Sequence, residues 1–179
     1  PKNSWGYTEG NHFKTPYELI CNLIDVVSKN GCLMLNVGPK ADGTICDEEA
    51  HALREIGKMD EKKTARRFTA PHPTGFLVKA PPIPAAPSGK SSPLPKKDFR
   101  FTYRPGELYV FAMKPNAKNV YRIKSLGARD DALNYDIRGV SLLGHDCKVS
   151  YHQTDNYLEL RAETAEQFEL PVCLKIEID

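Results

Sequence analysis

A helix pattern that runs directly into a short apolar stretch is the feature that most constrains the fold. Residues 15–30, "TPYELICNLIDVVSKN", carry apolar side chains at helical spacing. Thr15 fits the N-cap, Pro16 fits the first turn, and Glu18 completes a capping box, while Gly31 suits the left-handed position after the helix. The continuous apolar run at residues 32–37 predicts a strand covered on both faces. A helix followed by a buried strand is typical of α/β proteins, which build parallel sheets.

The apolar run ends in a stiff turn. Gly38-Pro39 stops the predicted strand, and Asp42-Gly43 supplies the positive φ that a tight turn needs. Asp47 is expected to cap a second helix, whose apolar side is formed by Ala50, Leu53 and Ile56. In a parallel α/β unit the carboxyl end of a strand faces the active-site side. On the residues alone, this turn fits a functional loop or ordinary turn chemistry, and both interpretations stay open.

The C-terminal part of the chain has a different pattern. Residues 98–179 hold short alternating stretches separated by Gly, Pro, Asn and Asp, which predicts antiparallel strands. Aromatic residues recur there at strand spacing: Phe99, Phe101, Tyr103, Tyr109, Phe111, Tyr121, Tyr151 and Tyr157. Aromatic residues in such positions are more often core than sugar platform, so we expect them to pack inside.

Two motifs connect these patterns to a known family. "SWGY" at residues 4–7 and "ELICNLIDVVSKNGCLMLNVGPKADGTI" at residues 18–45 resemble the α-L-fucosidases of glycoside hydrolase family 29. The resemblance implies an α/β plus all-β fold. Residues 1–62 would form the last β/α units of a (β/α)8-like catalytic barrel, and residues 98–179 would form a C-terminal antiparallel β-sandwich. The chain begins at Pro1 and not at Met, so we expect a fragment.

Residues 63–97 do not fit the family. Eight prolines between residues 71 and 95 predict an irregular connector. Allowed codons for residues 63–78, read two bases later, give "NGEAIYGTAPNRVFG", which is close to the family phrase expected there. Both ends of the stretch fall at Lys-Lys pairs, whose codons make adenine runs. We hypothesise that residues 64 to about 96 are read in the wrong frame.

The resemblance implies a retaining exo-α-L-fucosidase, which hydrolyses terminal α-L-fucose from glycans. Retention requires two carboxyl groups beside the scissile bond, and in the family both lie upstream of "SWGY". Glu9, Glu18, Asp42 and Glu48 match no catalytic family position, so we expect no catalytic residue in this chain and no activity from it alone. The implied partners are a fucosylated glycan, bound through the complete enzyme, and the upstream barrel segment. Family members are usually secreted, periplasmic or lysosomal.

Three residues are candidates for substrate binding. Trp5 corresponds to a family aromatic that lies near the C6 methyl group of fucose, where an apolar ring would select against a hydroxymethyl group. The alternative is that Trp5 is a packed barrel residue without a ligand. Tyr7 and His12 are neighbours that would line the same rim.

Composition argues against several other classes. A net charge of +2 does not indicate a nucleic-acid-binding surface, and no apolar run reaches the roughly 18 residues of a membrane span. The five histidines are scattered and the five cysteines show no C-x-x-C spacing, so neither a metal nor a cofactor is expected. We expect Cys21 and Cys32 to be buried thiols. The alternative function is a non-catalytic β-sandwich that binds carbohydrate or only packs against a barrel.

Overall fold

The computed structural model describes residues 4–61, 99–129 and 136–179. The predicted connector at residues 63–97, and with it the hypothesis of a shifted reading frame, lies outside the described residues. Within these described ranges, two α-helices precede residue 62, and seven strands and a short 3-10 helix follow residue 98.

Helix α1 (Pro16–Ser28) begins as its sequence predicts. The Thr15 hydroxyl oxygen accepts a hydrogen bond from the backbone N–H of Glu18 at 3.2 Å, and the Glu18 carboxylate accepts one from the backbone N–H of Thr15 at 2.7 Å. This is the expected capping box. The end of the helix differs from the prediction, because Asn30 and not Gly31 takes the left-handed conformation, with φ of 59°. Asn tolerates this conformation nearly as well as Gly does.

The predicted buried strand at residues 32–37 is not formed in the described part of the chain. Residues 31–40 have no regular structure, and Cys32 is exposed and not a buried thiol. Leu33, Met34 and Leu35 are also exposed, Met34 by 85%. A strand needs a hydrogen-bonded neighbour, and none of the described strands lies beside this segment. The α/β units of the expected barrel are therefore not seen here.

Helix α2 (Asp47–Glu61) follows the extended segment. Its first turn is closed by the backbone N–H of Ala50, which donates to the carbonyl oxygen of Cys46 at 3.0 Å. Cys46 therefore precedes the helix as its cap residue, one position before the predicted Asp47. Ala52 is buried, while Leu53 stays 37% exposed.

The C-terminal part consists of two antiparallel sheets. The four-stranded sheet has the order β1-β2-β7-β4, and the three-stranded sheet has the order β3-β6-β5. The strands are β1 (Phe99–Arg104), β2 (Glu107–Ala112), β3 (Val120–Ile123), β4 (Ile137–Leu142), β5 (Val149–Gln153), β6 (Leu158–Ala162) and β7 (Val172–Ile178), with the short 3-10 helix η1 (Lys124–Leu126) after β3. Each of the pairings in these sheets is antiparallel.

One hydrophobic core joins the facing sides of the two sheets. It contains side chains from both, among them Leu108 and Val110 of β2, Leu160 of β6 and Leu174 of β7, all fully buried. This is the packing of a β-sandwich. Of the eight aromatic residues at strand spacing in residues 98–179, only Tyr151 is exposed. Its hydroxyl donates to the carbonyl oxygen of Ile137 at 3.0 Å. The aromatic residues are therefore mainly packing residues, as predicted.

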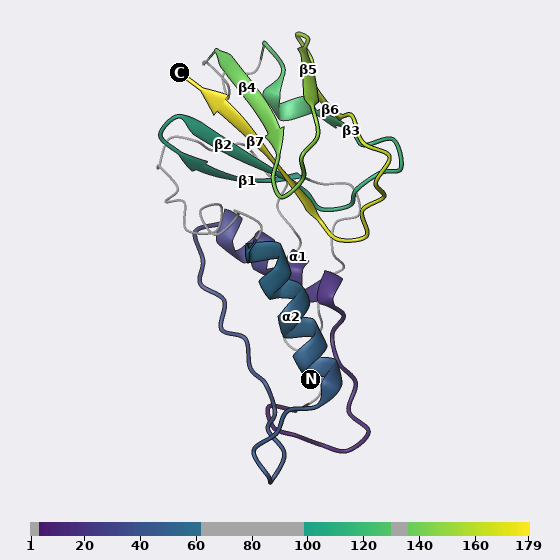
Figure 1. The fold of residues 1–179 in the computed structure, drawn as a ribbon. Helices are drawn as coiled ribbons and strands as arrows, with labels where there is room; N and C mark the ends of the chain where they lie inside the picture. Colours follow the sequence, from purple (N-terminus) through teal and green to yellow (C-terminus); the bar gives the residue numbers. More distant parts are fainter. Residues whose placement is uncertain (1–3, 62–98, 130–135) are drawn as a thin grey trace.

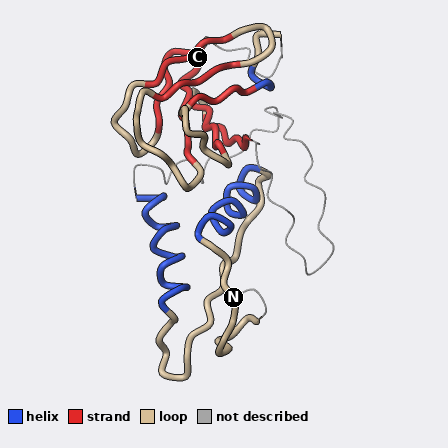
Figure 2. Tube along the Cα trace, turned by 90° about the vertical axis from the view of Figure 1, so that its right-hand side faces the viewer, coloured by secondary structure: helices blue, strands red, loops and turns tan. Residues whose placement is uncertain are grey.

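Helix α1 covers the other side of the four-stranded sheet. Ile20, Cys21 and Ile24 pack against Tyr109 and Phe111 of β2 in a second hydrophobic cluster. Figures 1 and 2 show both helices on the same side of the strands. The described chain thus has a helical layer, a four-stranded layer and a three-stranded layer. Cys21 lies in the cluster between the first two layers and is buried, as predicted.

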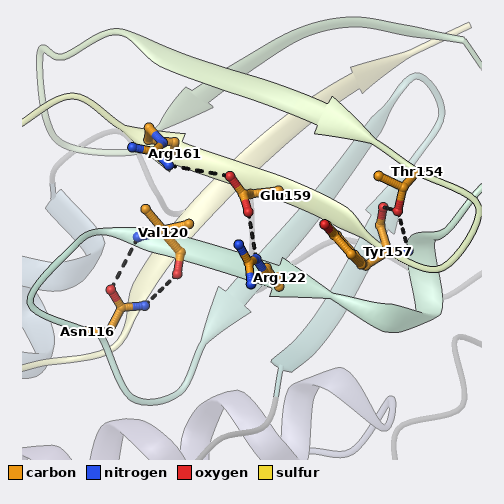
Figure 3. Close-up of polar contacts among 7 residues, drawn as sticks. All are labelled: Asn116, Val120, Arg122, Thr154, Tyr157, Glu159 and Arg161. Atoms are coloured by element: carbon orange, nitrogen blue, oxygen red, sulfur yellow. Dashed lines mark hydrogen bonds and ion pairs between the residues drawn. The ribbon is translucent and has the colours of Figure 1, made fainter.

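The outer face of the three-stranded sheet is charged. Glu159 on β6 accepts a hydrogen bond from Arg122 Nε on β3 at 2.6 Å and lies 3.6 Å from Arg161 Nη2 (Figure 3). The Arg122 guanidinium also lies 5.6 Å from the centre of the Tyr157 ring. Exposed ion pairs of this kind, across strands as in Arg122–Glu159 or along one strand as in Arg161–Glu159, each stabilise a sheet by only a fraction of a kcal/mol.

Candidate functional site

A cavity of about 260 Å³ lies between the N-terminal loop, α1, the extended segment and the start of α2. Its walls are mainly apolar, and the polar side chains among them come from both helices and both loops. It is lined by Ser4, Trp5, Phe13, Lys14, Leu19, Asn22, Leu33, Met34, Leu35, Asn36, Val37, Glu48, Glu49, Ala52 and Leu53. The structure therefore brings Trp5 to the cavity, whereas Tyr7 and His12 are not among the lining residues.

Trp5 is held through its backbone and leaves its ring accessible. Its carbonyl oxygen accepts a hydrogen bond from the Asn36 side-chain amide, and the next residue, Gly6, donates its N–H to the Ser4 hydroxyl oxygen at 3.2 Å. The side chain of Trp5 is 82% exposed. A large apolar ring at the wall of a cavity can contact an apolar part of a ligand.

The other two candidates lie further from the cavity. Tyr7 is 44% exposed and has the Lys40 ammonium group 5.7 Å from the centre of its ring, which is a cation–π contact. His12 is exposed. Trp5 therefore lines the cavity while Tyr7 and His12 lie outside its lining, and the role of the three residues in substrate binding stays a prediction.

Gly38 explains why the apolar run ends in Gly-Pro. A Cβ atom at this position would lie 2.6 Å from the backbone nitrogen of Tyr7, which is closer than real contacts allow. The Gly38 N–H also donates to the carboxylate of Glu49, at 3.2 Å from each oxygen. Glycine is needed here because two stretches of backbone touch.

The following turn is closed by its own side chains. Asp42 Oδ1 accepts hydrogen bonds from the Thr44 backbone N–H at 3.0 Å and from the Thr44 hydroxyl at 2.7 Å. These hydrogen bonds lower the pKa of the Asp42 carboxyl group, with the backbone donor as the largest cause. Gly43 has φ of 82°, as the sequence predicts for this turn. Asp42 is thus a turn residue.

Sequence reasoning missed Glu49 and Asn36. Glu49 is only 6% exposed although it is charged, and its carboxylate lies 3.6 Å from the Cys46 thiol. Its position three residues after the cap residue is the capping-box position. The sequence does not reveal this capping box, because its cap residue is Cys46 and Cys is not among the usual N-cap residues. Asn36 gives no signal, since it lies inside an apolar run.

Two glutamates line the cavity, and both come from α2. Glu48 and Glu49 are consecutive on α2 and reach the cavity from one wall. A retaining glycosidase needs its two carboxyl groups on either side of the scissile bond. Among the described residues, no group of three or more His, Cys, Asp or Glu side chains could hold a metal ion. No described helix has both the length and the apolar character needed to cross a membrane.

Comparison with known sequences gives a family match at the N-terminal end. Residues 1–63 match the family model described as Alpha-L-fucosidase. The plasma alpha-L-fucosidases of Pongo abelii and Homo sapiens are each 39% identical over 59 residues, which is 31% of this chain and 13% of those proteins.

Comparison with solved structures extends over nearly the whole chain. Alpha-L-fucosidase isoenzyme 1 from Paenibacillus thiaminolyticus matches with a TM-score of 0.70 at 21% identity, covering 99% of this chain and 38% of that one. An alpha-fucosidase from Thermotoga maritima, solved in complex with a mechanism-based inhibitor, matches with a TM-score of 0.71 at 22% identity, over 97% of this chain and 37% of that one. The chain therefore spans less than two fifths of the solved enzymes whose fold it shares.

Proposed function

We propose that this chain, whose first 63 residues match the alpha-L-fucosidase family model, is the C-terminal part of a retaining exo-α-L-fucosidase acting on fucosylated glycans. The observation that carries the proposal is the agreement of two independent matches. The family match covers the loop and helices around the cavity, and the fold match covers 99% of the chain.

In the complete protein, residues 1–62 would form the end of a catalytic barrel. The exposed apolar segment at residues 32–37 supports this assignment, because its side chains face water while its pattern is that of a buried strand. An upstream barrel segment would provide the missing neighbour and cover Leu33, Met34 and Leu35. Residues 63–97 would connect the barrel to the sandwich at residues 98–179.

Trp5 would bind the sugar through its C6 methyl group. Its exposed indole ring at the cavity wall supports this role. Packing a methyl group on an aromatic ring excludes water and disfavours a hydroxymethyl group, which would bring a hydroxyl to an apolar surface. Tyr7 and His12 would lie at the rim of the site in the complete enzyme, since both are accessible.

The two catalytic carboxyl groups would come from the upstream part of the protein. We therefore expect the complete protein to hydrolyse an aryl α-L-fucoside and the isolated chain to show no turnover. A nucleophile and a general acid each contribute several orders of magnitude to the rate. The test is a chromogenic assay of both proteins, with the stereochemistry of the first product followed by NMR.

The controls decide the interpretation. Sequencing upstream of Pro1 defines the complete protein, and an expression host that lacks fucosidases removes background activity. Inversion of configuration, or no turnover by the complete protein, would contradict the proposed function. Turnover by the isolated chain would show that its own carboxylates are catalytic.

A further inference from the structure

Two loops that are distant in sequence make paired contacts near the cavity. Asn36, Gly38 and Lys40 each contact the N-terminal loop: Asn36 at the Trp5 carbonyl, Gly38 at the Gly6–Tyr7 backbone and Lys40 at the Tyr7 ring. Alternate residues of an extended chain face the same side. One side of the segment at residues 36–40 therefore holds the loop that carries Trp5 (Figure 1, where the purple and blue loops meet).

Glu49, in the first turn of α2, also holds this segment through a hydrogen bond. Both of its carboxylate oxygens lie 3.2 Å from the Gly38 nitrogen, and its side chain is almost fully buried at the start of α2. A hydrogen bond to a charged acceptor is roughly twice as strong as one between neutral groups. Because Glu49 lies in the first turn of α2, its hydrogen bond connects the extended segment to a regular helix.

Gly38 lies against the backbone that directly follows Trp5. Gly38 touches the backbone of Gly6 and Tyr7 with no space for a Cβ atom, so a shift of Gly38 would release the loop directly. Asn36, two residues earlier, holds the Trp5 carbonyl itself. The contacts thus run from Glu49 through Gly38 to the loop, and end one residue from the indole ring.

We propose that Glu49 is a positioning residue for Trp5, acting through the Gly38 N–H, and that it thereby sets selectivity for a 6-deoxy sugar. The sugar part of this inference rests on the proposed function. The positioning part does not, because it concerns contacts present in the chain alone.

The single tryptophan of the chain makes the positioning directly measurable. In the anisotropy decay of its fluorescence, the amplitude of the fast component reports local motion of Trp5. We expect this amplitude to rise about twofold in Glu49→Ala and in Gly38→Ala, and to stay near the wild-type value in Glu49→Gln, whose amide oxygen still accepts from Gly38. Glu55→Ala is the matched control, since Glu55 lies on the same helix and pairs only with Lys58 in the described part of the chain.

One further variant, Asn36→Ala, calibrates the measurement. Asn36→Ala removes the contact to the Trp5 carbonyl and shows the size of the signal for a released loop. If Glu49→Ala loses its helical circular dichroism and so does not fold, the anisotropy decay of Gly38→Ala is used to test the proposal. An unchanged decay in folded Glu49→Ala and Gly38→Ala, beside a changed decay in Asn36→Ala, would overturn the proposal.

The complete enzyme provides the test of selectivity. An aryl α-L-galactoside differs from the fucoside only by a hydroxymethyl group in place of the methyl group. We expect Glu49→Ala to lower the ratio of kcat/KM between fucoside and galactoside by about tenfold, and Glu55→Ala to leave it unchanged. An unchanged ratio in Glu49→Ala would overturn the selectivity claim. A complete protein without any fucosidase activity would instead refute the proposed function and leave the anisotropy result standing.

Discussion

Arg100 is a fully buried charged residue in the layer between α1 and the four-stranded sheet. Its Nε atom donates to Asp25 Oδ1 of α1 at 2.8 Å, and its Nη1 atom donates to the carbonyl oxygen of Phe99 at 2.9 Å. Removing one partner of a buried charge costs more than the pair itself contributes, because the remaining charge loses its compensation. We expect Asp25→Ala to lower the free energy of unfolding by about 2–3 kcal/mol, measured by urea denaturation.

Lys29 provides the matched control, since it pairs with the same carboxylate at 2.8 Å but is half exposed. Lys29→Ala should change stability by less than about 0.5 kcal/mol, because exposed ion pairs contribute little. If Asp25→Ala and Lys29→Ala lose the same free energy of unfolding, the loss in Asp25→Ala does not come from the buried charge of Arg100.

Cys21 makes the stability of the chain sensitive to alkaline pH. Burial raises the pKa of the Cys21 thiol from about 9 to about 11. The unfolded chain therefore loses this proton first, and the stability that the neutral thiol contributes is present below pH 9 and lost as the pH rises towards 11. We expect the free energy of unfolding of the wild-type chain, measured by urea denaturation, to fall above pH 9, by on the order of 1 kcal/mol per pH unit. Cys21→Ala should flatten this slope, and an identical slope in that variant would contradict the assignment.

Single residues with a local role were predictable from the sequence. Thr15, Glu18, Asp42 and Gly43 act through neighbours within four positions, so their spacing already contains the interaction. Glu49 was not predictable in the same way. Its partner Gly38 lies eleven residues away across a loop, and the reason for a buried carboxylate appears only when the two segments meet.

At the scale of elements, α1 depends on its first turn. The capping box is its local stabilisation at the N-terminal end. We expect Thr15→Ala to lower the free energy of unfolding by about 1 kcal/mol, because the N–H of Glu18 loses its acceptor. Thr15→Ser should retain most of the stability, as serine supplies the same hydroxyl. A comparison of the urea midpoints of the three proteins measures this, and equal losses in Ala and Ser variants would exclude the cap as the cause.

The extended segment shows what an element pattern cannot predict. Residues 32–37 have the composition of a buried strand, yet residues 32–36 are exposed and Val37 is only partly buried. Pattern predicts which conformation a segment prefers, but a strand is formed only with a partner. The strands of the sandwich have their partners within the described chain, and they lie within residues 98–179, for which alternation predicts strands. The predicted end of α1 was wrong for a smaller reason, since Asn30 and Gly31 can both accept the left-handed conformation.

At the scale of the whole molecule, the sandwich is not independent of the helices. From the sequence, residues 98–179 have the size and the alternating strands of a unit that folds alone, whereas residues 1–60 hold a strand pattern without neighbours and are not expected to fold alone. In the structure, the helices bury Tyr109, Phe111 and Cys173 on the outer side of the four-stranded sheet, while the sandwich core lies on its inner side. Alternation along a strand predicts that one face is covered but does not say by which element. The covering helix could be recognised only in three dimensions.

The contact between α1 and the four-stranded sheet predicts how residues 98–179 and residues 1–60 behave when each is expressed separately. Residues 98–179 keep the core between the two sheets, so we expect a soluble piece with a cooperative melt. They lose α1, which leaves the aromatic side chains of β2 in water. A loss of about 2 kcal/mol would lower the Tm by roughly 10 °C relative to the whole chain and would allow binding of a hydrophobic dye. Residues 1–60 keep two helices without the sheet that covers Ile20 and Ile24, so we expect aggregation or no cooperative transition. The measurement is circular dichroism against temperature on residues 98–179, on residues 1–60 and on the whole chain. If residues 98–179 have the same Tm as the whole chain and bind no dye, α1 contributes nothing to the stability of the sandwich.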